Sequence, residues 1–123
     1  MDHGPRILDL SYLIETADGD PDFVDEILSE FLLEMATRVG ELESLLAHSE
    51  LDKLIRAAHT IKGASANVGA TRVRETASVL EAQIRKGQLA GSVLLISLLR
   101  QELERVRDLV IREGVEKLMK ASA

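Results

Sequence analysis

Histidine is the side chain in this sequence best suited to nucleophilic chemistry near neutral pH, and the chain has three of them. Cysteine is absent, so thiol chemistry and disulfides are excluded. His3 lies close to the N-terminus, and His48 lies at a predicted helix end where a positive charge suits the helix dipole. Both positions are typical of surface histidines. His59 differs because it falls in the middle of a predicted amphipathic helix.

The helix around His59 is predicted to point the imidazole into solvent. At about 100° per residue, one side of this helix collects apolar and small residues. These are Leu51, Leu54, Ala58, Ile61 and Ser65. His59 falls roughly 120° from the centre of that side. Lys62 follows three residues later, and Ile55 and Gly63 lie one turn away on either side, where we expect Ile55 to be exposed. A glycine inside a helix costs about 1 kcal/mol relative to alanine, so Gly63 is not there for stability. Periodicity alone still favours an ordinary solvated histidine.

The residues after His59 add a specific motif, because segment 58–69 reads AHTIKGASANVG. This segment resembles the signature of histidine phosphotransfer domains, in which lysine follows the histidine by three positions, and glycines follow it by four and by ten. Lys62, Gly63 and Gly69 occupy those positions here. The later pair Leu80-Glu81 is also similar to the family, and the expected order of helices is similar from about residue 8 to residue 111.

The resemblance implies a phosphocarrier of phosphorelay signal transduction. Such a domain accepts a phosphoryl group on His59 and exchanges it with the aspartate of receiver domains in response regulators or hybrid histidine kinases. The chemistry is reasonable, since neutral imidazole is a competent nucleophile and phosphoryl transfer mainly requires positioning and charge stabilisation. Lys62 would stabilise the phosphoryl charge, and Gly63 would leave room for the partner. Mg²⁺ is expected in the partner receiver domain, and no cofactor or metal is expected in this domain.

The predicted docking surface for a receiver domain surrounds His59. It includes Ile55 and Ala66 as apolar contacts and Arg56 as a partner for an acidic rim. The sequence contains no nucleotide-binding motif, so we expect a carrier without autonomous kinase activity rather than an enzyme. Two alternatives stay open at this point. Beside the phosphocarrier, these are a protein-interaction helical bundle without phosphate chemistry and a phosphoacceptor domain cut from a chemotaxis-type kinase.

Composition narrows the possible partners and location. The net charge is −6, aromatic residues make up only 2%, and no long basic run occurs, which argues against nucleic acid as a partner. No apolar run is long enough to cross a bilayer and no signal-peptide pattern opens the chain, so we expect no membrane insertion. Together with the absence of cysteine, this predicts a cytoplasmic protein.

One acidic cluster resembles a calcium loop but does not fit it. Asp18, Asp20 and Asp22 match the opening of an EF-hand, yet Phe23 replaces the required glycine and Ser29 replaces the final glutamate. Helix capping explains these aspartates better, with Asp20 as the N-cap of a helix whose first residue is proline.

Hydrophobic periodicity predicts an all-α fold without strands. The expected elements are a short helix near 8–14 and four longer ones, which begin at Pro21, directly after Ser49, between Gly69 and Val73, and at Gly91-Ser92. A capping box is expected at 49–52. Short connections favour an up-down antiparallel four-helix bundle, with the short N-terminal helix across one end. The histidine phosphotransfer domain is expected to span 1–114, with 115–123 as a helical extension or linker tail.

Overall fold

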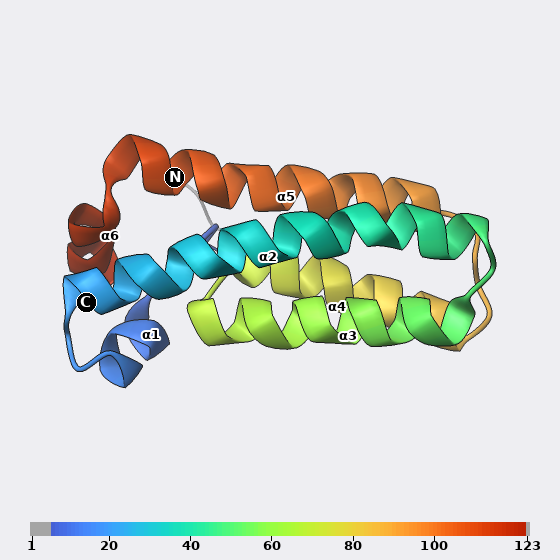
Figure 1. Ribbon diagram of the computed structural model, residues 1–123, viewed down its shortest axis with the longest axis horizontal. Helices are drawn as coiled ribbons and strands as arrows, with labels where there is room; N and C mark the ends of the chain where they lie inside the picture. The colour runs from blue at the N-terminus through green and yellow to red at the C-terminus, as the bar shows by residue number, and fades with distance from the viewer. Residues whose placement is uncertain (1–5, 123) are drawn as a thin grey trace.

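The computed structural model describes residues 6–122, and this part of the chain folds into helices without strands (Figure 1). The helices are α1 (Ser11–Thr16), α2 (Pro21–Ala47), α3 (Leu51–Val68), α4 (Thr71–Arg85), α5 (Ser92–Glu113) and α6 (Val115–Ser122). The predicted all-α class is confirmed. His3 lies outside the described residues.

The four long helices form an antiparallel bundle. Following the chain in Figure 1, α2, α3, α4 and α5 run alternately in opposite directions. α3 packs against α2 and α4, whereas α5 packs against α4 and α2, and α3 and α5 make no direct helix contact. These two helices are therefore diagonal to each other, and the predicted up-down bundle is confirmed.

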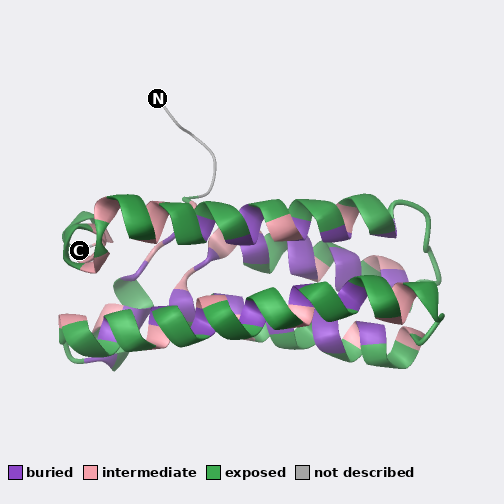
Figure 2. Cartoon of the chain, turned by 45° about the horizontal axis from the view of Figure 1, so that its top comes forward, coloured by how far each residue is buried: buried purple, intermediate pink, exposed green. Residues whose placement is uncertain are grey.

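The core of the bundle is aliphatic, as the scarcity of aromatic residues requires. Buried residues line the inner sides of the long helices, and exposed residues cover the outside (Figure 2). Along α2, the buried side chains recur every three or four residues, which is the predicted helical period. They are Val24, Leu28, Phe31, Met35, Val39 and Leu42.

The start of α2 follows the prediction, but the start of α3 does not. The Asp20 carboxylate accepts a hydrogen bond from the backbone N–H of Asp22, and Pro21 is the first helical residue. The capping box predicted at 49–52 is wrong, because Glu50 is the N-cap and makes no side-chain cap bond. Ser49 has a left-handed φ of 54°, and the N–H after it bonds back to the Leu45 carbonyl. Ser49 therefore closes α2 instead of capping α3.

The two short helices, α1 and α6, lie at one end of the bundle (Figure 1). α1 begins later than predicted, since Leu8 and Leu10 are buried in the segment that precedes it. Residues 115–122, predicted as a helical extension or linker, form a helix that packs on α1, α2 and α5. The Ser122 hydroxyl accepts a hydrogen bond of 3.1 Å from the Leu10 N–H.

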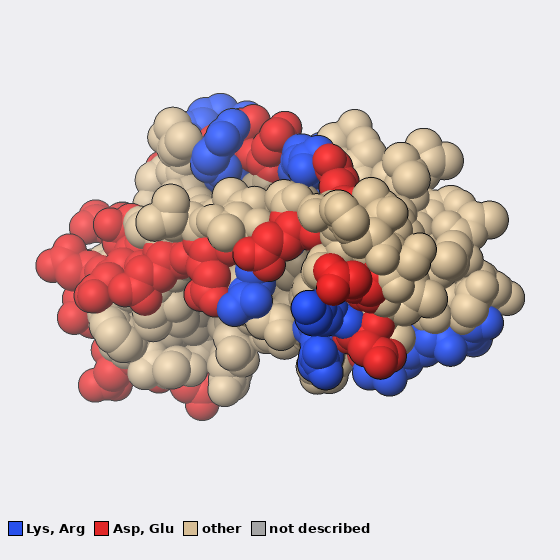
Figure 3. Space-filling view, turned by 45° about the vertical axis from the view of Figure 1, so that its right-hand side comes forward, with Lys and Arg blue, Asp and Glu red and all other residues tan. Residues whose placement is uncertain are grey.

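Charge is unevenly distributed over the surface. In Figure 3, acidic side chains gather toward one end of the molecule, while basic and acidic groups lie next to each other along the upper edge, where α5 runs. Residues 87–99, which connect α4 to α5 and form the first part of α5, contain no charged residue. Within the described residues, no helix is long and apolar enough to cross a membrane.

Candidate functional site

His59 lies in the middle of α3, on the side of this helix that borders α4. Its side chain is 63% exposed, whereas Ala58 and Ile61 of the same helix are fully buried. The exposure that the helical wheel predicted for His59 is therefore confirmed. Because α3 is packed on both α2 and α4, the imidazole is carried on a rigid element.

The nearest polar partner of His59 is Glu81 of α4. The imidazole Nδ1 lies 3.2 Å from Glu81 Oε2 and 3.4 Å from Oε1. The Glu81 side chain is only 6% exposed, so its charge requires partners. Lys62 Nζ lies 2.6 Å from Oε1, and the Arg85 guanidinium donates to Oε2 at 2.8 and 3.0 Å. The buried Glu81 carboxylate thus holds the side chains of Lys62 and Arg85 next to the exposed histidine.

The Glu81 carboxyl is ionised at neutral pH. Burial alone would raise the pKa of this carboxyl, but hydrogen bonds from Lys62, Arg85 and His59, together with the charge of Lys62, lower the pKa to about 2. An ionised carboxylate only accepts hydrogen bonds, so His59 must donate its Nδ1–H to it. In the neutral ring, the unprotonated Nε2 then carries the nucleophilic lone pair.

Lys62 and Gly63 complete the surroundings of the imidazole. Lys62 shares the Glu81 carboxylate with His59, which holds its ammonium beside the ring. Gly63 is exposed, and a Cβ built at this position meets no atom within 4 Å. Close helix packing therefore does not explain this glycine, and the space next to His59 is open.

The predicted docking residues differ in exposure. Arg56 and Ala66 are exposed on α3. Ile55 is half-buried and packs against the core, so the expectation that it stands free in solvent is wrong. His48 is exposed at the end of α2. Its Nδ1 lies 2.8 Å from the Ser44 carbonyl oxygen, so the side chain caps one of the last carbonyl groups of the helix.

The sequence pattern alone predicts no role for Glu81 or Arg85. A signal for Glu81 was present, because the Leu80-Glu81 pair belongs to the family resemblance. Glu81 and Arg85 also have the four-residue spacing of a helical ion pair. Their approach to His59 depends on how α3 and α4 pack, which the periodicity of either helix alone does not reveal. Residues 6–122 contain no group of three or more histidine, aspartate or glutamate side chains that could hold a metal ion.

These features define a class of protein: an all-helical bundle in which a buried carboxylate orients an exposed imidazole, that of His59, in the middle of a long helix. The family model of the Hpt domain matches residues 26–109, which is most of the chain, and the chain belongs to this family. Hpt domains are phosphocarriers that act by histidine phosphotransfer in phosphorelays, with partners from two-component relays. No curated protein and no solved structure matches the chain.

Proposed function

We propose that this chain carries a phosphoryl group on His59 and exchanges it with the aspartate of receiver domains. The observation that carries the proposal is the hydrogen bond between His59 Nδ1 and the buried Glu81 carboxylate. It orients the ring, and in the neutral imidazole it places the proton on Nδ1 and leaves the lone pair on Nε2.

The transfer step balances without a proton leaving the site. Nε2 attacks the phosphorus of an aspartyl phosphate, an N–P bond forms, and the P–O bond to the aspartate breaks. The imidazole keeps its Nδ1–H and becomes positively charged, and the Glu81 carboxylate offsets that charge. Lys62 lies near enough to stabilise the transferring phosphoryl group. The reverse step returns the phosphoryl group to a receiver aspartate.

The partner supplies what this domain lacks in the proposed reaction. The receiver domain, from a response regulator or a hybrid histidine kinase, brings the aspartate and Mg²⁺. It docks on the α3 surface formed by Ile55, Arg56, Gly63 and Ala66, where Ile55 contributes the edge of a half-buried side chain. The chain acts as a carrier in the cytoplasm without kinase activity of its own.

The experiment is phosphoryl transfer from an isolated receiver domain that has been phosphorylated with a small phosphodonor. We expect label on the parent chain that is lost in acid and retained in alkali, as for a phosphoramidate. His59→Gln should accept no label and should change the free energy of unfolding by less than about 0.5 kcal/mol, since the residue is exposed and Lys62 and Arg85 remain as partners of Glu81. His48→Gln is the matched control and should accept label normally. Label retained by His59→Gln would move the phosphoacceptor elsewhere.

A further inference from the structure

α5 carries a stripe of largely exposed side chains on its outer surface, next to α2. The members are separated alternately by four and three residues, a spacing that keeps side chains on one face of a helix. They are Val93, Ser97, Arg100, Glu104, Arg107 and Ile111. The ends of the stripe are apolar and strongly exposed, since Val93 is 71% and Ile111 74% accessible.

The α5 stripe can pair with the same stripe of a second copy that runs in the opposite direction. When a second α5 runs antiparallel, with the twofold axis at the level of residue 102, Arg100 faces the partner's Glu104. Val93 then faces the partner's Ile111, Ser97 faces the partner's Arg107, and each contact occurs twice. Apolar residues thus meet at both ends, and opposite charges meet in the middle.

We propose that two copies of this chain associate through antiparallel pairing of their α5 stripes. The neighbouring face of α5 does not offer the same match. There, Leu94 and Leu98 are also exposed, but pairing that face about its own middle places Leu94 against Arg112 and Leu98 against Asp108. Exposed apolar area alone therefore does not select the contact, whereas self-complementarity selects the Val93 stripe.

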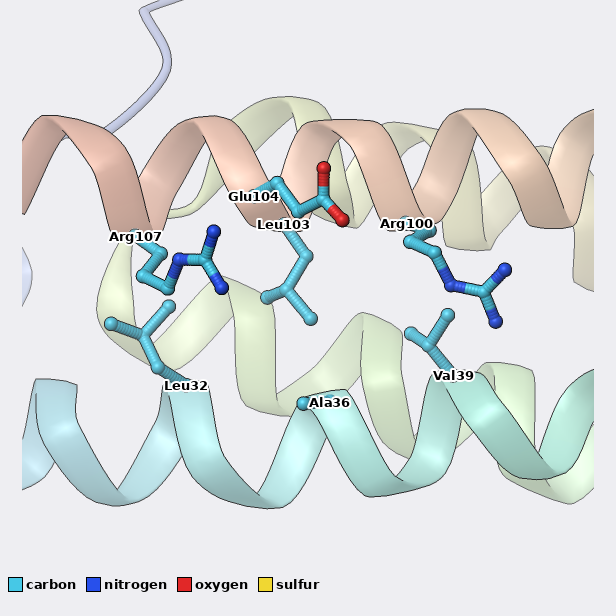
Figure 4. Close-up of a pocket in the computed structure, with 7 residues that line it drawn as sticks. All are labelled: Leu32, Ala36, Val39, Arg100, Leu103, Glu104 and Arg107. Carbon is cyan, nitrogen blue, oxygen red and sulfur yellow. The ribbon is translucent and has the colours of Figure 1, made fainter.

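The seam between α2 and α5 is open beneath this stripe. A hollow of about 150 Å³ has an apolar floor formed by Leu32, Ala36, Val39 and Leu103. In Figure 4, Arg100 and Arg107 extend from α5 at either end of the hollow, with Glu104 between them. Val39 and Leu103 are already buried, so a second helix lying along the stripe would remove from water the apolar surface of Leu32 and Ala36.

Charge favours this part of the surface for association of two acidic chains. Two copies that each carry −6 repel one another, but the stripe contains two arginines and one glutamate. Arg100 already contacts Glu43 of α2 at 2.6 Å, and both side chains remain about half exposed. A guanidinium has five donors, so Arg100 can bind a second carboxylate from the partner.

The proposed dimer leaves His59 accessible. α5 is diagonal to α3 in the bundle, and the backbones of the two helices do not approach each other closely. Each copy would therefore present its imidazole on the side away from the dimer contact, so receiver docking and dimer formation do not compete.

Sedimentation equilibrium of the full chain tests the proposal. We expect the parent to approach twice its 13.5 kDa mass at high protein concentration. Glu104→Arg and Arg100→Glu each place like charges opposite one another, so each should raise the dimer dissociation constant by roughly tenfold or more. An equimolar mixture of the two variants should associate again, because the new carboxylate at position 100 then faces the new guanidinium at position 104.

Leu94→Asp is the matched control, because Leu94 is 75% exposed and lies on the neighbouring face of α5. It should leave association unchanged, and thermal melting verifies the fold of each variant. A parent chain that stays at 13.5 kDa at every concentration overturns the proposal. So does a mixture of the two charge variants that remains monomeric, or a Leu94→Asp variant that dissociates as strongly as Glu104→Arg.

Discussion

Glu81 links the stability of the bundle to the orientation of the proposed phosphoacceptor. A buried carboxylate without partners is strongly destabilising, and here Lys62, Arg85 and His59 all meet the same group. The arrangement fixes three long or rotatable side chains around one anchor. At the scale of single residues, the orientation of the ring therefore depends on a side chain that solvent barely reaches.

The pH dependence of stability should report the state of Glu81. Folding lowers the pKa of this carboxyl from 4.5 to about 2, so its ionised form stabilises the folded state above pH 4.5. That contribution is lost as the pH falls from about 4.5 to about 2. Relative to Glu81→Gln, the parent should lose up to about 3 kcal/mol of unfolding free energy across this window. Urea unfolding of both proteins at pH 7, 4.5 and 2.5 measures the difference, and parallel profiles would contradict it.

We expect Gly63 to lower the stability of the domain and to leave space next to His59. An added Cβ meets open space, so Gly63→Ala should raise the free energy of unfolding by about 0.5–1 kcal/mol. Helical side chains lean toward the N-terminus, so a long side chain at position 63 would lie over the imidazole. We expect Gly63→Gln to melt higher than the parent and to accept phosphoryl groups much more slowly. Melting curves and single-turnover transfer rates measure the two effects, and transfer at the parent rate would refute the clearance argument.

At the scale of elements, α3 is both a core helix and the platform of the site, and its C-terminus is anchored by a second glycine. Gly69 adopts a left-handed φ of 76° and ends the helix. Its carbonyl accepts a hydrogen bond of 2.9 Å from the Asp9 N–H, which ties the segment before α1 to the end of α3. The glycine ten positions after His59 thus has a structural role, whereas Gly63 leaves space.

Gly69→Ala should therefore have the opposite sign from Gly63→Ala. A Cβ at position 69 would lie 1.6 Å from the Asp9 carbonyl oxygen, and the left-handed backbone adds further strain. We expect a loss of at least about 2 kcal/mol of unfolding free energy. Urea unfolding of the two alanine variants side by side is the measurement. Equal effects would show that the contact with Asp9 yields without cost.

Helix periodicity predicted the long elements well because each long helix buries one continuous side. Leu54, Ala58 and Ile61 are buried as expected, and the cap of α2 at Asp20 was read correctly. The capping rules gave a wrong prediction in the short connection between α2 and α3, where the end of one helix lies next to the start of the other. Ser49 resembles an N-cap, but its left-handed conformation is used to close α2. At the N-terminal end, Leu8 and Leu10 continue the apolar pattern without being helical, because they pack on the bundle from a segment without regular secondary structure.

At the scale of the whole molecule, the sequence predicted only those features of the site that lie on α3 itself. The exposure of His59 and the nearness of Lys62 follow from spacing along α3. The contact with Glu81 joins residues 22 positions apart on two helices, so it depends on the rotation of α4 against α3. The partial burial of Ile55 has the same origin. Helical periodicity predicts that Ile55 is exposed, but packing against the core covers part of its side chain.

Removing α6 tests whether this helix stabilises the fold without contributing to the site. α6 contacts α1, α2 and α5 but neither α3 nor α4, which hold His59 and Glu81. Three of its side chains, Val115, Leu118 and Met119, are half-buried against the core. Ending the chain after Gly114 would expose their contact surface and leave the Leu10 N–H without the Ser122 hydroxyl.

We expect this truncation to lower the free energy of unfolding by about 1–3 kcal/mol, from the lost apolar burial and the lost hydrogen bond. Phosphoryl acceptance at His59 should continue at the parent rate below the melting temperature, because no contact of α6 reaches the helices of the site. Urea unfolding and single-turnover transfer on the shortened chain measure the two quantities. A slowed transfer in a chain that is still folded would show that α6 acts on the site through α2 or α1, and that residues 1–114 are not a self-sufficient phosphotransfer unit.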